Sequence, residues 1–314
     1  MPHQQQRPTF GWDLAGYGNS GSGLCRADRS GNAITATVLR ATFVCKPKLK
    51  MESAIGKTAM IEREMLRLIT QVGAVYIDVP IDLQDLPRVV DFQSHATADR
   101  YWQLVKRPID HAFDALEPLG SNLGYAVARI ARLLGNLAAT GSAVDLDRNI
   151  FETYPAASLR LIAGANDSGD VAYKAGQIAW TGERWRPRNI AKNPSEETLR
   201  RSSAFAELAG ALRLRADEGV ALNDDEFDAV LCAVTGCIPE SAVKDDDLET
   251  LMRARLAQRG VPESIVRGAV PPKGYVLLRG IPANLQITVR TVTCRTPSDL
   301  YAAITAPTVA GDDS

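Results

Sequence analysis

The sequence predicts an α/β protein in which a mixed central sheet is flanked by helices and carries a helical insertion. Two observations lead to this fold class. Three segments with strand character open the chain, and an amphipathic helical segment and a short buried strand follow them. Further along, a second helical segment separates that strand from the next one, which is typical of an insertion between sheet strands.

Composition sets the limits within which this fold must be built. With 314 residues, 45% hydrophobic and 23% charged, the chain can bury a sizeable core, and we expect one domain over residues 1–314. We find neither a secretory signal nor an apolar run of the roughly 18–20 residues that span a bilayer, so we expect a soluble, cytoplasmic protein without membrane contact. Five scattered cysteines without a CxxC pair favour free thiols over a zinc site.

The opening strands are predicted from their composition and from the turns between them. Residues 9–14 form a short apolar run, and the glycine-rich stretch 15–23 is expected to turn the chain. Strands are then expected over 24–27 and 33–44, because the second segment is rich in β-branched side chains and the turn 28–32 separates the two. Three antiparallel strands therefore open the fold.

The next elements are predicted from the spacing of apolar residues. Apolar positions between 57 and 72 recur at helical spacing, so an amphipathic helix is expected there. Residues 74–79 form a short buried strand that contains Asp78 near its end. Residues 83–147 are predicted to be the helical insertion, since they are polar at first and then helical over 123–139.

The remaining elements are predicted from terminal signals and periodicity. Ser195 is a suitable N-cap for one helix, and Asn223 or Asp224 for the helix after it. The remaining predicted elements are a strand over 149–153, helices over 155–162, 195–218, 225–234 and 247–258, and a strand pair over 274–281 and 285–293 around Pro282 and Asn284.

Five acidic residues are distinguished by their positions at the ends of elements. Asp13, Asp78 and Glu152 lie where predicted buried strands end, while Asp225 and Asp228 lie three apart on one side of a helix start. A carboxylate at the end of a buried strand loses hydration unless a cation compensates it. We therefore predict that these five residues form a catalytic cluster.

The carboxylates predict a metal-dependent chemistry. Converging carboxylates repel one another, and a divalent metal ion is the usual remedy. Oxygen ligands favour Mg²⁺ or Mn²⁺ over zinc, so we expect one of these ions, held by Asp13, Asp78, Glu152 and Asp228. Paired ions about 4 Å apart would activate water and stabilise the leaving oxygen of a phosphodiester. For each residue alone, the alternative is a structural role as a turn acceptor or helix cap.

A local mixture of basic and aromatic residues is the second functional feature. Trp185, Arg186 and Arg188 lie in segment 180–192, where they are expected to stack bases and neutralise phosphates of a nucleic acid or nucleotide substrate. Because the net charge of the chain is only −1, such binding must come from a local patch. Lys174 is expected to contact a phosphate near the carboxylates. The alternatives are a solvated loop paired with nearby glutamates, and a surface lysine.

Six sequence blocks occur in order along most of the chain: GWDLAG, VYIDVPIDL, FETYPAASLRLI, the pair Tyr173 and Lys174, DDEFDAVLCAVTG and KGYVLLRGIP. Together they resemble the successive blocks of domain-of-unknown-function family 429, whose members are predicted RNase H-like nucleases. The order strand, strand, strand, helix, strand also resembles the RNase H-like fold. The resemblance implies a metal-dependent nuclease site at the five carboxylates. The chain lacks the glycine expected after Pro80, so Asp82 is an alternative to Asp78.

The function expected from these features is hydrolysis of phosphodiester bonds with Mg²⁺ or Mn²⁺, with water as the nucleophile. Two alternatives stay open. One is a nucleotide-binding protein of the actin-like ATPase type, in which an aspartate and a glycine-rich hairpin hold phosphate. The other is a non-catalytic module that binds nucleic acid through the basic loop.

Overall fold

The computed structural model describes residues 6–15, 21–45, 52–83, 106–116, 118, 123–142, 144–163, 173–188, 194–261 and 263–308. Its strands are β1 (Thr9–Asp13), β2 (Gly23–Ser30), β3 (Ala33–Arg40), β4 (Ala74–Ile77), β5 (Ile150–Thr153), β6 (Gln177–Trp180), β7 (Trp185–Pro187), β8 (Leu214–Ala216), β9 (Ala221–Asn223), β10 (Ala242–Val243), β11 (Tyr275–Leu278) and β12 (Gln286–Thr293). Its helices are α1 (Thr42–Cys45), α2 (Glu52–Val72), α4 (Pro108–Phe113), α5 (Leu123–Ala139), α6 (Pro155–Ala163), α7 (Glu196–Ala211), α8 (Asp224–Cys237), α9 (Asp245–Gln258), α10 (Glu263–Gly268) and α11 (Pro297–Thr305), with a 3-10 turn at Pro239–Ser241.

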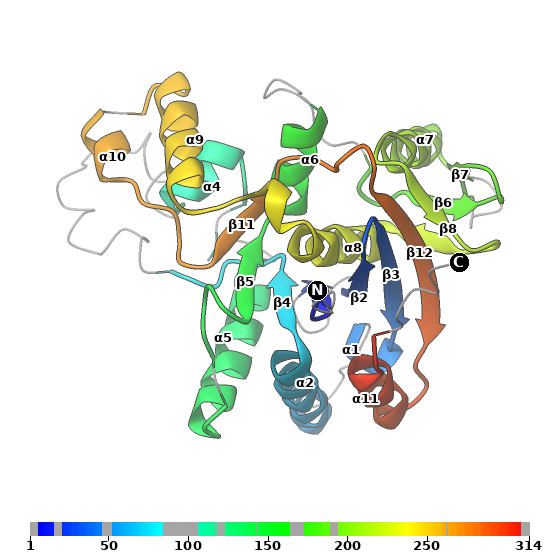
Figure 1. Cartoon of the computed structure of the whole chain (residues 1–314). Helices are drawn as coiled ribbons and strands as arrows, with labels where there is room; N and C mark the ends of the chain where they lie inside the picture. The colour runs from blue at the N-terminus through cyan, green and yellow to red at the C-terminus, as the bar shows by residue number, and fades with distance from the viewer. Residues whose placement is uncertain are drawn as a thin grey trace.

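A nine-stranded mixed sheet forms the centre of the molecule, in the order β10-β11-β5-β4-β1-β2-β3-β12-β8 (Figure 1). The strands β1, β2 and β3 are an antiparallel meander, as the sequence predicted, and β4 and β5 lie parallel to β1 on its other side. A separate three-stranded antiparallel sheet has the order β7-β6-β9. The predicted α/β class, with a mixed central sheet flanked by helices, is confirmed.

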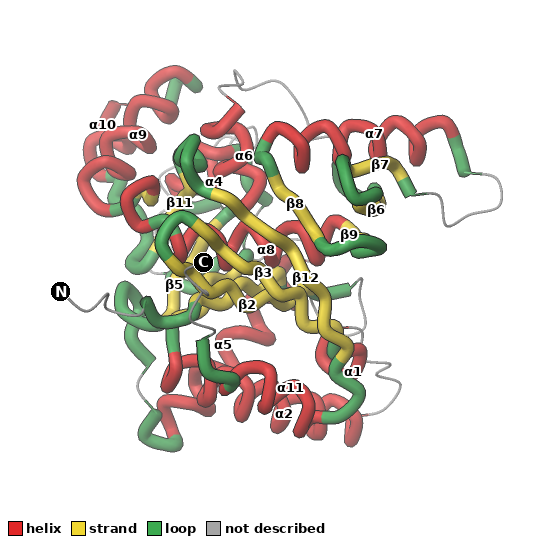
Figure 2. The backbone as a smooth tube through the Cα atoms, turned by 45° about the vertical axis from the view of Figure 1, so that its right-hand side comes forward, coloured by secondary structure: helices red, strands yellow, loops and turns green. Residues whose placement is uncertain are grey.

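Helices cover both faces of the central sheet (Figure 2). On one face, α2, α5 and α11 share a core with apolar side chains of β1 and β4, including Phe10 and Trp12. On the other face, α8 lies against β1 and β2, and α6 and α7 contribute to the same core. A third cluster joins α4, α9 and β11 beside the sheet. No helix among the described residues is both long and apolar enough to cross a membrane.

Two glycines let α8 lie directly on the sheet. A Cβ atom at Gly11 of β1 would overlap the backbone carbonyl of Ala229, and one at Gly23 of β2 would overlap that of Asp225. Glycine is the residue that permits such a close backbone approach. The first turns of α8 are therefore held against the end of β1, which positions the acidic residues of this helix.

Most predicted elements are present, although some boundaries differ. The helix over 123–139 coincides with α5, and the helices over 57–72 and 247–258 are present with earlier starts, as α2 and α9. Ser195 caps α7 by accepting a hydrogen bond from the Thr198 N–H at 3.2 Å, as predicted. Asn223 rather than Asp224 caps α8, and it forms a reciprocal capping box with Glu226.

Two predicted segments were too long because a local change of backbone geometry ends each element early. The strand predicted over 33–44 stops at Arg40, and helix α1 begins at once, since the N–H groups of Val44 and Cys45 both donate to the Ala41 carbonyl. The helix predicted over 195–218 stops at Ala211. Arg213 then adopts a left-handed φ of 56°, and residues 214–216 join the central sheet as β8.

The predicted pairing of the last two strands is wrong. β11 pairs with β5 and β10, whereas β12 pairs with β3 and β8. Because the sheet is already continuous from β5 to β3, the two late strands extend it in opposite directions rather than forming a hairpin. In the predicted insertion 83–147, the described residues include α4 and α5, and residues 84–105 lie outside the described part.

Candidate functional site

The parallel pairing of β1 with β4 brings two of the predicted carboxylates to the same end of the sheet. Asp13 is the last residue of β1, and Asp78 follows β4, where its N–H donates to the Trp12 carbonyl at 3.0 Å. Asp228 reaches the same place from α8, which crosses this part of the sheet. All three side chains line one cavity of about 270 Å³, together with Glu152 from β5.

Asp228 is the most enclosed member of the cluster, with a side chain that is fully buried. The Tyr173 hydroxyl donates to its Oδ1 at 2.5 Å, and the Lys174 ammonium donates to its Oδ2. Asp224, one turn earlier on α8, accepts a hydrogen bond of 2.8 Å from the Ala175 N–H. The start of α8 thus holds the turn Tyr173–Lys174–Ala175 over the carboxylates, and the Lys174 side chain is half exposed.

The surroundings disfavour ionisation of these carboxyl groups. Burial and the neighbouring charge of Asp228 together raise the pKa of Asp78 to about 7, although Lys174 opposes the shift. Burial likewise raises the pKa of Asp13 well above its usual range and raises that of Asp228, although Lys174 opposes both shifts. Partial desolvation lowers the pKa of the Lys174 ammonium, but the negative charges of the three carboxylates outweigh this effect and raise it. Lys174 is therefore a cation held by the cluster and is not available as a neutral nucleophile.

Glu152 lines the cavity, but an arginine already engages both of its oxygens. The Arg107 guanidinium donates to Glu152 at 2.6 and 3.0 Å and to both oxygens of Asp110 at 2.8 and 2.9 Å. The Ile81 N–H donates a further hydrogen bond of 2.8 Å to Glu152. All three charged side chains are almost fully buried. This network fixes helix α4 against the end of β5, and it satisfies Glu152 without a metal ion.

The structure separates the other predicted acidic residues from the cavity. Asp82 accepts from the Lys273 N–H at 3.1 Å and lines a different pocket, of about 370 Å³, so Asp78 is the residue that faces the cluster. Asp225 lies on α8 near Asp13 and contributes to the raised pKa of Asp13, but it does not line the cavity.

A buried hydroxyl beside the cavity has no hydrogen-bond partner among the described residues. Thr153 is almost fully buried and lines the cavity, and its hydroxyl has no hydrogen-bond partner among the described residues. Buried hydroxyls are rarely left unpaired, so this group is an exception in the wall of the cavity. The carboxylates supply the oxygen donors that Mg²⁺ and Mn²⁺ prefer. However, within the described ranges no three Asp, Glu, His or Cys side chains are arranged as a ready metal site.

The predicted basic loop forms a hairpin, β6–β7, away from the carboxylate cavity. Trp185 is buried, and its indole N–H donates to the Leu214 carbonyl at 2.8 Å, so its ring supports the hairpin instead of presenting a face for base stacking. Arg186 and Arg188 are exposed. The end of the predicted segment, residues 189–192, lies outside the described residues. Of the predicted substrate-binding residues, Lys174 alone lines the carboxylate cavity.

Sequence reasoning missed Arg107 and Tyr173 as determinants of the site. Arg107 precedes a proline that begins α4, and the sequence RPID contains the cap and the Asp110 partner that the helix start uses. This local signal identifies a helix start, but it does not reveal the contact with Glu152, 45 residues away. Tyr173 stands out only through its position beside Lys174.

Comparisons with known proteins identify a family. A family model described as "Protein of unknown function (DUF429)" matches residues 33–243, about two thirds of the chain. The match includes Asp78, Glu152, Lys174 and Asp228, and it begins after Asp13. No curated protein and no solved structure matches the chain. The extent of the family match establishes that the chain belongs to DUF429.

Proposed function

We propose that the protein is a divalent-metal-dependent phosphodiester hydrolase, a nuclease of RNase H-like type. The observation that carries this proposal is the convergence of Asp13, Asp78 and Asp228, from three separate elements, on one cavity. Burying mutually repelling carboxylates costs folding free energy unless cations compensate them, so a cluster of this kind points to function. The ion pair of Lys174 with Asp228 supports the proposal, since it places one cation against the cluster.

The topology supports the RNase H-like part of the proposal. The order β3-β2-β1-β4-β5 places an antiparallel meander beside two parallel strands. Parallel strands direct their carboxyl ends to one edge, which is where Asp13 and Asp78 lie. The sequence resemblance to predicted RNase H-like nucleases is independent of this geometry. Topology alone assigns no activity, so the carboxylates carry the functional argument.

Asp13, Asp78 and Asp228 are the residues that would hold Mg²⁺ or Mn²⁺. A bound ion would lower the pKa of a coordinated water and stabilise the charge that develops on a phosphodiester. Lys174 would leave Asp228 when the ion binds, because both compete for the same carboxylate. Its side chain is half exposed, so the ammonium has solvent available on leaving. Glu152 stays with Arg107 and keeps the wall of the cavity in place.

A second candidate is a non-catalytic nucleic-acid-binding module. It is favoured by one observation, that Lys174 and Tyr173 already satisfy Asp228. In such a protein, the ion pairs would stabilise the fold, and metal would bind weakly or not at all.

Titration with Mn²⁺ by calorimetry, beside a cleavage assay on single- and double-stranded DNA and RNA, tests the proposal. Asp13→Asn and Asp78→Asn are expected to abolish cleavage and to weaken Mn²⁺ binding at least tenfold, since each removes a charged ligand. Asp82→Asn is the matched control for Asp78→Asn, because Asp82 lies four residues away and lines another pocket.

The outcomes separate the two candidates. Loss of cleavage in the Asp13 and Asp78 variants, with activity kept in Asp82→Asn, supports the hydrolase. A folded wild-type protein that binds no Mn²⁺, even with nucleic acid present, refutes the hydrolase and favours the binding module.

A further inference from the structure

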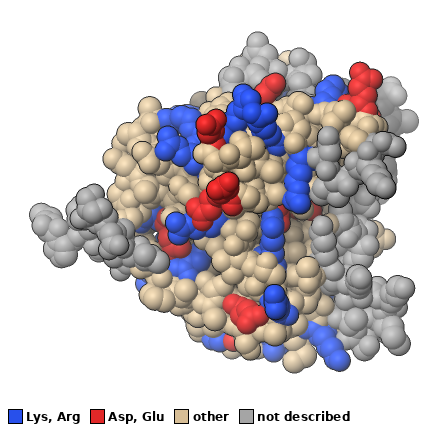
Figure 3. Space-filling view, turned by 90° about the vertical axis from the view of Figure 1, so that its right-hand side faces the viewer, with Lys and Arg blue, Asp and Glu red and all other residues tan. Residues whose placement is uncertain are grey.

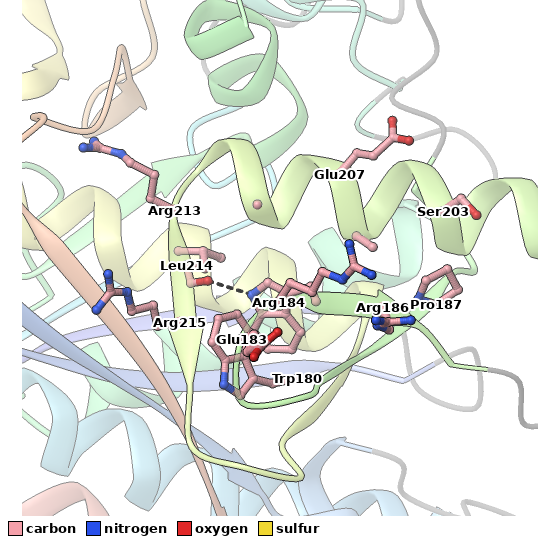
Figure 4. A pocket seen from close by; sticks show the side chains of 13 residues that line it. Trp180, Glu183, Arg184, Arg186, Pro187, Ser203, Glu207, Arg213, Leu214 and Arg215 are labelled. Carbon is pink, nitrogen blue, oxygen red and sulfur yellow. Dashed lines mark hydrogen bonds between the residues drawn. The ribbon is translucent and has the colours of Figure 1, made fainter.

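A groove of about 590 Å³ lies outside the carboxylate cavity, between the β6–β7 hairpin, helix α7 and strand β8 (Figure 4). Arg184 and Arg186 line it from the hairpin, and Arg213 and Arg215 line it from β8 and the residue before it. Ser203 and Glu207 of α7 form the opposite wall. Residues separated by about 30 positions in the sequence thus build one concave surface.

Three of the four arginines in the groove are free to bind a ligand. Arg213 donates to the carbonyls of Ile281, Pro282 and Ala283, so it is already engaged in holding that turn. Arg184, Arg186 and Arg215 are exposed, and they have no hydrogen-bond or ion-pair partner within the part of the chain described. Such guanidinium groups are suited to phosphate, which they bind through two parallel hydrogen bonds.

Basic residues outnumber acidic ones in the lining of the groove. Its lining includes four arginines against two carboxylates, Glu183 and Glu207. On the side of the molecule viewed in Figure 3, basic and acidic side chains are interspersed. Because the net charge of the whole chain is −1, this excess of positive charge is a local feature of the groove lining. An anionic ligand is therefore directed to this groove.

An aromatic side chain adds a preference for bases. Trp180 lines the groove and is partly exposed, and its ring makes an edge contact with Trp185, with centroids 5.5 Å apart and planes at 65°. Trp185 is itself fixed by its hydrogen bond to Leu214, the dashed line in Figure 4. Trp180 is thus held in a defined orientation beside the free arginines. A positioned indole next to guanidinium groups is the arrangement that binds unpaired bases and their phosphates.

We propose that this groove binds single-stranded nucleic acid, with Arg184, Arg186 and Arg215 on phosphates and Trp180 against a base. Stacking on Trp180 requires a base that is free of its partner strand, which favours a single strand over a duplex. β6 begins shortly after Lys174, and β9, its partner in the small sheet, leads directly into α8 with Asp228. The small sheet therefore connects the groove to Lys174 and Asp228 of the carboxylate cavity, although no described residue lines both sites. The inference deepens the proposed hydrolase by naming its substrate class, but it depends on different residues.

Fluorescence anisotropy with a short labelled oligothymidylate, measured in EDTA at several salt concentrations, tests the groove without metal or turnover. Binding through three arginines predicts a slope of log K against log salt of about −2, since each phosphate contact on a single strand contributes about −0.7. Arg184→Gln with Arg186→Gln is expected to reduce the slope to about −0.7 and to weaken binding at least tenfold. Trp180→Ala is expected to weaken binding about tenfold with the slope unchanged.

The matched control is Arg132→Gln with Arg148→Gln, two exposed arginines outside the groove, which should bind like the wild type. Trp180→Phe keeps an aromatic ring and should bind nearly as well as the wild type. Binding by this variant would show that the weaker binding of Trp180→Ala comes from the lost ring and not from misfolding. Asp13→Asn should also bind normally, so failure of the hydrolase does not affect this test.

Two results would overturn the proposal. One is equal loss of binding in the control pair, which would indicate diffuse charge attraction. The other is that a duplex or heparin binds as tightly as the oligothymidylate, with an affinity that Trp180→Ala does not change. This result would mean that the groove binds polyanions without recognising bases.

Discussion

Lys174 balances the carboxylate cluster, and its removal separates the two candidate functions. In the absence of metal, its ammonium is the cation closest to Asp228 and lowers the raised pKa of Asp13 and Asp228. A divalent ion would compensate the same carboxylates with twice the charge. Lys174 therefore competes with metal for the site.

Replacing Lys174 by Met is expected to make the metal-free protein less stable at pH 8 and to strengthen Mn²⁺ binding at least tenfold. Both effects follow from leaving Asp13, Asp78 and Asp228 without a cation, since paired charges near a protein surface interact by several kcal/mol. Thermal unfolding with and without Mn²⁺ measures both. Lys57→Met, at an exposed position on α2, is the control. A folded Lys174→Met protein whose unfolding temperature does not respond to Mn²⁺ would contradict a metal site.

The raised pKa of Asp78 makes stability depend on pH in an unusual direction. Its pKa is about 7 in the folded protein and 3.8 as the ordinary value, so the folded state binds more protons between these limits. The contribution of Asp78 to the free energy of unfolding is therefore greatest below about pH 4. This contribution falls as the pH rises toward 7. Once the group is fully ionised, the loss is on the order of 4 kcal/mol, from a shift of about 3 pKa units at about 1.4 kcal/mol for each unit.

Urea denaturation of the metal-free protein across this pH range measures the effect. Asp78→Asn removes the titrating group, so its stability should vary less between pH 4 and pH 7. Saturating Mn²⁺ should restore the stability of the wild type at pH 7 by favouring the ionised form. A wild-type stability that rises over this range would mean that other groups dominate.

Residue positions were predictable where the pattern was local. Asp13 and Asp78 stand at the ends of apolar strands, and parallel strands bring such ends together, so their meeting followed from the sequence. The ion pair between Glu152 and Arg107 did not follow from the sequence, because Arg107 lies in a polar segment whose apolar residues show no periodicity. Composition likewise identified Trp185 as an aromatic neighbour of arginines, but it gave no sign that the ring is buried.

At the scale of elements, the placement of α8 decides whether a site exists. This helix carries Asp224 and Asp228, and it approaches the sheet only because β1 and β2 present glycines beneath it. The sequence predicted the helix and its cap from local signals. It did not predict the contact with Gly11, since the glycine and the helix are about 220 residues apart.

Gly11→Ala is expected to destabilise the protein by about 1–3 kcal/mol or more, because the added methyl group overlaps the backbone of α8. Displacement of the helix should also weaken Mn²⁺ binding. Gly135→Ala is the matched control, since Gly135 lies in α5 with nothing within 4 Å of the added methyl group. It should stabilise the helix by about 0.5–1 kcal/mol. Chemical denaturation of both variants gives the comparison, and equal stability of the two would mean that α8 can shift freely.

Elements near strand ends were the hardest to predict. Residues 214–216 continue the helical periodicity of α7, but Arg213 turns the chain and β12 offers them a pairing edge. The strand is preferred over the helix for residues 214–216 because of their pairing with β12. That contact joins residues too far apart in the sequence for local patterns to predict it. The same holds for β11 and β12, whose partners are set by the edges that the rest of the sheet leaves open.

The whole molecule depends on strands from both ends of the chain. The family match covers 33–243, yet β1 and β2 precede it and β11 and β12 follow it, and β1 and β2 lie in the middle of the sheet. A fragment limited to 33–243 is therefore expected not to fold. Circular dichroism and size exclusion would detect this as loss of cooperative unfolding and an expanded chain. The full-length protein is the control, and a compact fragment that unfolds cooperatively would contradict the prediction.

The pairing of β12 with β3 has a consequence for synthesis of the protein. Eight residues of β3, from Ala33 to Arg40, align in register with Gln286–Thr293, about 250 residues later. At ribosomal rates of about 5–20 residues per second, β12 is synthesised on the order of 12–50 s after β3. During that time the nascent chain presents an open strand edge, the feature that promotes aggregation. We therefore expect the N-terminal strands to be prone to aggregation until β12 has been synthesised.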